Sequence, residues 1–148
     1  MYSGSYAVTM DAKGRLAIPA RVRDQLVDEC SGRMVVTAHH AERCLLIYAE
    51  PQWQLLAPQI QALPNIQSAA VRRLQRKLLG HAAPLEMDGN GRILLPPTLR
   101  DFAGLEKDLI IAGLGHRLEI WSETAWAASI DDAEDDGDLP TAALSLNI

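Results

Sequence analysis

Two segments of the chain share a pattern of residues that could bind an anion. They read DAKGRLAIPARVRD at Asp11–Asp24 and DGNGRILLPPTLRD at Asp88–Asp101. In both, an Asp opens a Gly-containing turn, where its carboxylate can accept hydrogen bonds from the backbone amides of the turn. The Gly permits a positive φ. The Arg that follows lies across the turn, within reach of a carboxylate or a phosphate. The pattern therefore predicts two similar tight turns, each with a basic side chain beside it.

The two copies differ where the first copy carries additional positive charge. At an offset of 77 residues, six positions are identical: Asp11/Asp88, Gly14/Gly91, Arg15/Arg92, Pro19/Pro96, Arg23/Arg100 and Asp24/Asp101. Residues kept in both copies are expected to serve the fold, so Asp88 and Arg92 are interpreted as a structural pair. For Arg15, which lies beside the additional cations, pairing with Asp11 and a functional role both stay open. Lys13 and Arg21 have only Asn90 and Thr98 as counterparts. We therefore expect the first copy to contact a polyanion, with a merely solvated surface as the alternative.

Each turn lies within a longer repeated unit that must position it. In the first unit we expect a strand at 5–10, a returning strand at 15–18, a short helix from Pro19 to about Leu26, and a hairpin of MVVTA and CLLIY. The second unit repeats this order, and CLLIYAEPQW resembles RLEIWSETAW. An internal duplication is therefore predicted, with one repeat at 5–53 and the other at 81–126.

A connector at 54–80 and a tail at 127–148 complete the expected organisation. Pro58 and Pro64 should interrupt the amphipathic first part of the connector. A better helix is predicted from Ser68 as N-cap to Gly80 at the C-cap. Its basic face could be solvated, or could meet acidic groups such as Glu50 of a neighbouring subunit or the tail. The tail has six acidic residues within 131–138 and is expected to be flexible.

The charge distribution favours a polyanionic partner although the whole chain is acidic. The net charge is −5, yet residues 1–23 hold four cations against one Asp, a net of +3. No apolar run approaches the ~20 residues of a membrane span, and the N-terminus lacks the pattern of a secretory signal. Only two cysteines occur, which indicates reduced thiols in a cytoplasmic protein. The HExxH, GxSxG and Walker motifs are missing, so we expect neither an enzyme nor a metal or cofactor site.

Four stretches together resemble the MraZ family of bacterial transcriptional regulators, which contain two SpoVT-AbrB-type repeats. They are YSGSYAVTMDAKGRLAIPARVR, RRLQRKLLGHA, MDGNGRILLPPTLR and LEIWSETAW, and the resemblance runs from about residue 1 to residue 128. It implies an α+β, mostly β fold, in which tandem swapped-hairpin repeats form one pseudo-symmetric barrel. It further implies a ring-shaped homo-oligomer that associates with the nucleoid. Such rings bind short direct repeats in double-stranded DNA upstream of the division and cell-wall gene cluster, and generally repress it.

Carried over residue by residue, the resemblance assigns two sets of positions. The residues expected to contact DNA are Lys13 and Arg15, with Arg21 and Arg23 as weaker candidates. The residues expected to form the structural motif are Asp11, Gly14, Asp88, Gly91 and Arg92. Two other functions stay open: an antitoxin whose acidic tail masks a basic partner, and a ring-shaped scaffold that acts through protein contacts alone.

Overall fold

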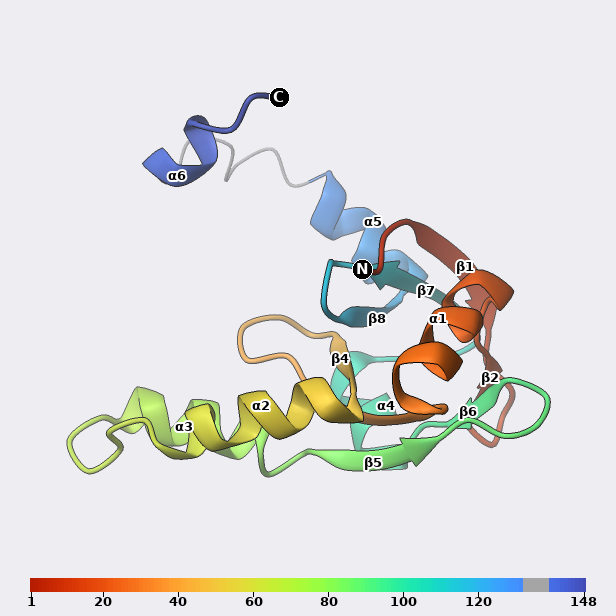
Figure 1. Ribbon diagram of the computed structural model, residues 1–148, viewed down its shortest axis with the longest axis horizontal. Coiled ribbons are helices and arrows are strands. Elements are labelled where there is room, and N and C mark those ends of the chain that lie inside the picture. Colours follow the sequence, from red (N-terminus) through yellow and green to blue (C-terminus); the bar gives the residue numbers. More distant parts are fainter. Residues whose placement is uncertain (132–138) are drawn as a thin grey trace.

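The computed structural model describes residues 1–131 and 139–148, and it has an α+β fold with mostly antiparallel strands (Figure 1). The strands are β1 (Ser5–Thr9), β2 (Arg15–Ala17), β3 (Arg33–Ala38), β4 (Leu45–Ala49), β5 (Ala83–Glu86), β6 (Arg92–Leu94), β7 (Asp108–Gly113) and β8 (Leu118–Ser122). The helices are α1 (Ala20–Cys30), α2 (Glu50–Gln61), α3 (Ala69–Leu78), α4 (Pro97–Ala103), α5 (Glu123–Ile130) and α6 (Thr141–Leu144). The expected α+β class is confirmed.

The strands form a six-stranded sheet and a separate two-stranded ribbon. The sheet has the order β1-β7-β8-β4-β3-β5, and the ribbon consists of β2 and β6. The first strand of each repeat lies beside the third strand of the other repeat, since β1 pairs with β7 and β5 pairs with β3. The ribbon likewise takes one strand from each repeat. The two repeats are therefore interleaved, and each sheet needs both of them.

The described strands form no closed barrel. β1 and β5 are the edges of the six-stranded sheet, and β2 and β6 pair only with each other. The strands on either side of the first turn also separate, because β1 joins the large sheet while β2 joins the ribbon. Only an isolated bridge between Met10 and Leu16 connects the two strands at the turn. The sequence predicted the turn but not this divergence of its strands.

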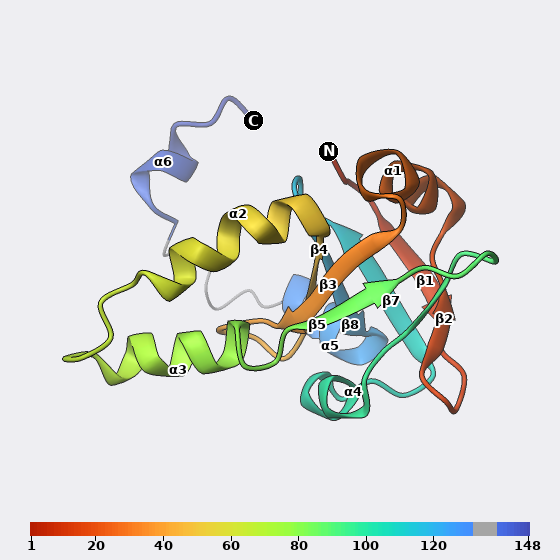
Figure 2. The same ribbon diagram turned by 60° about the horizontal axis from the view of Figure 1, so that its bottom comes forward.

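The central strand β4 of the large sheet is covered on both faces, which explains why all its residues are apolar. Every residue of β4 is buried. One face of β4, including Leu45 and Ile47, belongs to the main core with α1 and α4. On the other face, Leu46 and Tyr48 pack with residues of α2 and α3 (Figure 2). The strand therefore lies between two hydrophobic clusters and needs no alternation of apolar and polar residues.

The helical connector differs in two places from the sequence prediction. Pro58 does not interrupt α2, which continues to Gln61, and the next turn closes with a bond of 3.0 Å from Ala62 N to the Pro58 carbonyl. A proline removes only one helical hydrogen bond, and here the apolar side of α2 packs on the sheet. Ser68 caps α3 as expected, since its Oγ accepts from Val71 N at 3.1 Å. The C-cap of α3, however, is Leu79 rather than Gly80.

Segment 127–148, expected to be a flexible acidic tail, contains the last residues of α5 and the short helix α6. Most of its acid-rich run, at 132–138, lies outside the described residues. Within the part that the structure describes, no helix has the length and apolar character required to cross a membrane.

Candidate nucleic-acid interface

The first turn, residues 11–15, is held together by the carboxylate of Asp11. Its Oδ1 accepts hydrogen bonds from the backbone N–H groups of Lys13 and Arg15, both at 2.9 Å. The main chain closes the same turn, because Gly14 N donates to the Asp11 carbonyl at 3.1 Å. The N–H of Arg15 contributes most to lowering the pKa of Asp11 below its ordinary value, and the N–H of Lys13 also lowers it. Asp11 is therefore ionised at neutral pH and pre-organises the backbone that carries Lys13 and Arg15.

The second turn, residues 88–92, repeats these bonds and adds one. Asp88 Oδ1 accepts from the N–H groups of Asn90 and Arg92 at 2.8 and 2.9 Å. In addition, Arg92 Nε donates to Asp88 Oδ2 at 3.3 Å. Within residues 1–131 and 139–148, the side chains of Lys13 and Arg15 form no ion pair. The first turn therefore presents two cations without an ion-pair partner among the described residues, whereas the second turn pairs its Arg with Asp88.

The ribbon brings Arg15 and Arg92 onto one exposed face. Arg15 lies opposite Leu94, and Ala17 lies opposite Arg92, while the intervening pair of Leu16 and Ile93 is buried. Because side chains alternate along a strand, the Arg15 and Arg92 side chains leave the same side of the ribbon. Diagonal neighbours of this kind are about 7–8 Å apart. A two-stranded ribbon is also narrow enough to enter the major groove of DNA.

The helix arginines connect each repeat to the turn of the other. Arg23 of α1 donates from Nη1 to the Asn90 carbonyl at 3.4 Å, and its guanidinium covers Gly91. Arg100 of α4 donates from Nε to the Leu95 carbonyl at 3.1 Å and covers Gly14. Arg23 is therefore placed as a brace between the repeats. Arg21, by contrast, lies on the exposed side of α1.

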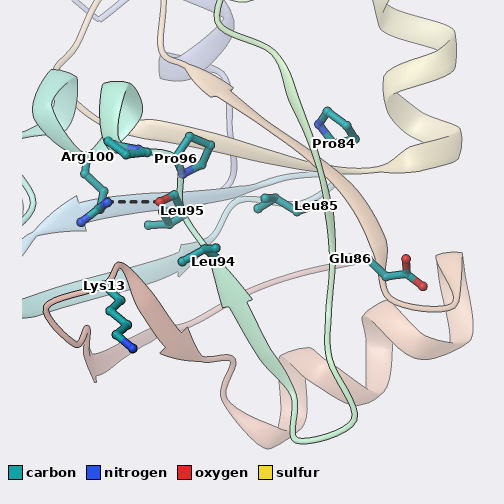
Figure 3. A pocket seen from close by; sticks show the side chains of 9 residues that line it. Lys13, Pro84, Leu85, Glu86, Leu94, Leu95, Pro96 and Arg100 are labelled. Atoms are coloured by element: carbon teal, nitrogen blue, oxygen red, sulfur yellow. Dashed lines mark hydrogen bonds between the residues drawn. The ribbon is translucent and has the colours of Figure 1, made fainter.

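An open groove of about 430 Å³ lies beside the first turn (Figure 3). Lys13 and Arg100 line it together with Glu86 of β5, and the side chains of residues 94–97 supply much of its apolar wall. The figure shows the Arg100 bond to the Leu95 carbonyl within this wall, with Lys13 and Glu86 on different sides of the groove. Sequence reasoning missed the groove because Lys13 comes from the first repeat, whereas its other lining residues come from the second. Only the interleaving of the repeats brings these residues together.

A buried polar cluster lies elsewhere, between the β3–β4 turn and β8. Ligand-type atoms of His39, Cys44 and Glu119 lie within 4.8 Å of one another. However, His39 Nδ1 accepts from the N–H groups of Ala41 and Glu42 at 3.0 and 3.1 Å, so Nε2 carries the proton of the neutral ring. Burial lowers the pKa of His39 and keeps that ring neutral. The Nε2 nitrogen therefore has no free lone pair for a metal.

Glu119 has a structural use in this cluster. Its carboxylate accepts from Trp121 Nε1 at 2.9 Å and lies 3.6 Å from Arg117 Nη2. These partners compensate the burial of a charged group in an otherwise apolar strand. Burial also raises the pKa of the Cys44 thiol, so the thiol stays protonated and unreactive.

Comparison with known proteins identifies both halves of the chain. A family model described as "MraZ protein, putative antitoxin-like" matches residues 1–77 and again residues 78–146. The chain belongs to the MraZ family. The two matches correspond to the two repeats, and each contains one Asp-x-x-Gly-Arg turn.

Several members of the MraZ family are similar over nearly the whole chain. The Transcriptional regulator MraZ of Saccharophagus degradans is 56% identical over 148 residues and covers 100% of both chains. The Transcriptional regulator MraZ of Marinobacter nauticus is 51% identical, over 99% of this chain and 98% of its own. That of Pseudomonas aeruginosa is 44% identical over 128 residues, which are 86% of this chain and 84% of its own.

Proposed function

We propose that this MraZ-family chain is a sequence-specific DNA-binding transcriptional regulator that represses the division and cell-wall gene cluster. The observation that carries the proposal is the difference between the two turns. Lys13 and Arg15 are exposed on a pre-organised turn without an ion-pair partner in the described part of the chain, whereas Arg92 is paired with Asp88. The names of the MraZ relatives, which are transcriptional regulators, support the same conclusion.

The proposed contact places the ribbon of β2 and β6 against the major groove. Arg15 projects from the exposed face of the ribbon, and an arginine can bind a guanine edge with two hydrogen bonds. Lys13, at the tip of the turn, would bind a phosphate. Arg21 on the exposed side of α1 would add a phosphate contact, and Arg23 would act mainly by bracing the second turn. The buried pair Leu16 and Ile93 fixes the ribbon to the core.

A ring of several copies would supply the affinity that one turn lacks. DNA affinity rises with the number of phosphates neutralised, and a single turn offers only a few. Several turns on one assembly would bind neighbouring direct repeats upstream of the chain's own gene through a high effective concentration. Association with the nucleoid follows from such binding. The proposal also includes the pseudo-symmetry implied by the family, in which the two interleaved swapped-hairpin repeats form one barrel-like unit that is not closed by strand pairing.

The experiment is fluorescence anisotropy with the DNA upstream of the chain's own gene, against a shuffled duplex of equal length and composition. The proposal predicts tight binding to the upstream DNA, much weaker binding to the shuffled duplex, and a loss when the direct repeats are altered one at a time. Equal, weak binding to both duplexes would contradict it. That result would favour a role through protein contacts, as an antitoxin-like protein or a scaffold.

A further inference from the structure

The α2–α3 hairpin forms an arm that projects from the sheet at the opposite end from the ribbon (Figures 1 and 2). We define the arm as residues 51–80, so that Glu50, the first residue of α2, lies just outside it. This segment contains four cations and no acidic residue: Arg72, Arg73, Arg76 and Lys77. All four lie on α3, so the arm concentrates a charge of +4 on one helix. This concentration is separate from the cations of the first turn.

Among the described residues, the fold does not neutralise this charge within one chain. Arg72 Nη1 donates to the carbonyls of Asn65 and Ile66 at 2.7 and 3.1 Å, and Lys77 Nζ donates to the His40 carbonyl at 3.2 Å. These acceptors are uncharged. In the described part of the chain, no cation of the arm forms an ion pair. Arg73 and Arg76 are exposed, one helical turn apart, on the same side of α3.

The arm also exposes large apolar side chains, both along α2 and at its tip. Leu55 is 67% exposed and Ile66 is 90% exposed. A groove of about 540 Å³ at the tip is lined by residues 63–68, including Leu63 and Pro64. A charged phosphate backbone does not pack favourably against such apolar surface. Mixed apolar and arginine-rich surface is typical of contacts between proteins.

The complementary surface is present on the same chain, around α5. From Ser122 to the C-terminus the sequence has seven acidic residues and no Lys or Arg, and the structure describes two of these acids, Glu123 and Asp131. In the described part of this segment, Glu123 lies in the first turn of α5 and Asp131 directly after its last turn, both exposed. Ile130 between them is 64% exposed. In one chain α5 packs on β7 and β8, while α3 packs on β3 and α2.

We propose that the arm of one copy binds the α5 surface of a second copy, with Arg73 and Arg76 facing Glu123 and Asp131. This inference rests on the ring assembly within the proposed function, and it assigns the subunit contact that builds the ring. Because the two surfaces differ, the contact is head to tail, and its repetition closes into a ring when the rotation between copies allows it. Opposite charges would select this pairing and its register.

The test is the mass of the full-length protein by size-exclusion chromatography with light scattering, in the absence of DNA. Arg73→Glu/Arg76→Glu should shift the protein from an oligomer to the 16.2 kDa of one chain. Glu123→Arg/Asp131→Arg should do the same. A chain that carries all four substitutions restores opposite charges between copies and should recover the oligomer. Misfolding cannot produce such a rescue. Lys13→Ala/Arg15→Ala is the control and should keep the wild-type mass.

Three results would overturn the inference. The first is an unchanged mass for Arg73→Glu/Arg76→Glu; an accompanying loss of DNA affinity would mean that the arm contacts DNA. The second is a failure of the four-substitution chain to reassemble while circular dichroism shows it folded. The third is a wild-type protein that is itself a monomer, which would also remove the ring from the proposed function. DNA binding by the first turn is measured separately, by anisotropy, and could survive any of these results.

Discussion

An alanine at Gly14 would test whether the first turn depends on the contact between the two repeats. Gly14 has a φ of +92°, and a Cβ on it would lie 2.7 Å from Arg100 Nε and 3.0 Å from the Leu95 carbonyl oxygen. Arg100 can move aside only by giving up the hydrogen bond from its Nε to that same carbonyl. The substitution therefore introduces both backbone strain and a collision with the second repeat.

The two effects can be estimated separately. A residue with a side chain in the left-handed region costs about 1–2 kcal/mol. Moving the Leu95 main chain also weakens the 2.9 Å bond from Leu95 N to the Gly14 carbonyl. A backbone hydrogen bond of this kind contributes about 0.5–1.5 kcal/mol. With the remaining overlap, Gly14→Ala should lower the free energy of unfolding by about 2–4 kcal/mol and Tm by about 5–12 °C.

Gly104→Ala is the matched control, because Gly104 has a φ of +62° and no atom lies within 4 Å of its added Cβ. It should lose only the about 1–2 kcal/mol of backbone strain. Thermal unfolding by circular dichroism gives both losses, and anisotropy at a temperature where both variants are folded gives their DNA affinity. Gly14→Ala should bind DNA more weakly than Gly104→Ala. If Gly14→Ala and Gly104→Ala had equal stability and equal DNA affinity, the claim that the second repeat supports the first turn would be refuted.

Two further predictions concern the same turns. Arg100→Ala should weaken DNA binding, because the Arg100 guanidinium supports the Gly14 turn. The salt dependence of binding should match wild type, since Arg100 is not proposed to contact DNA. A reduced salt slope in anisotropy would instead show that Arg100 contacts DNA. The pKa values of the Asp11 and Asp88 carboxyl groups are lower in the folded state than in the unfolded state. The ionised carboxylates therefore stabilise the fold at neutral pH, and this stabilisation is lost as the pH falls through the lowered pKa values. Urea unfolding from pH 7 down to pH 3 should therefore show a steeper loss for wild type than for Asp11→Asn/Asp88→Asn, and parallel curves would argue against this role.

Much of the local structure could be predicted from the sequence. The duplication placed both turns, and Asp11 and Asp88 hold them by the same backbone bonds. Ser68 was recognisable as an N-cap because its side chain and position alone define that role. Such features depend on residues a few positions apart, whose geometry is set by the local backbone.

Other features depend on how the two repeats meet, and the sequence could not supply them. Arg23 and Arg100 occupy equivalent positions in the two copies, yet each covers the glycine of the other copy's turn. Nothing within a single repeat indicates that exchange. The continuation of α2 through Pro58 was also missed, because packing of the helix on the sheet outweighs the lost hydrogen bond.

The central claim, that Lys13 and Arg15 bind DNA, is tested most directly by the salt dependence of binding to the upstream direct repeats. Each phosphate contact adds about 0.9 to the slope of log affinity against log salt concentration. Lys13→Ala/Arg15→Ala should therefore bind weakly, because it loses the proposed guanine contact of Arg15, and should lower the slope by about 0.9 for each engaged subunit, because Lys13 is the proposed phosphate contact. Arg33→Ala/Arg43→Ala, which removes two exposed cations outside the first turn and α1, should keep the wild-type affinity and slope. Wild-type affinity and slope in the Lys13→Ala/Arg15→Ala variant would contradict the account.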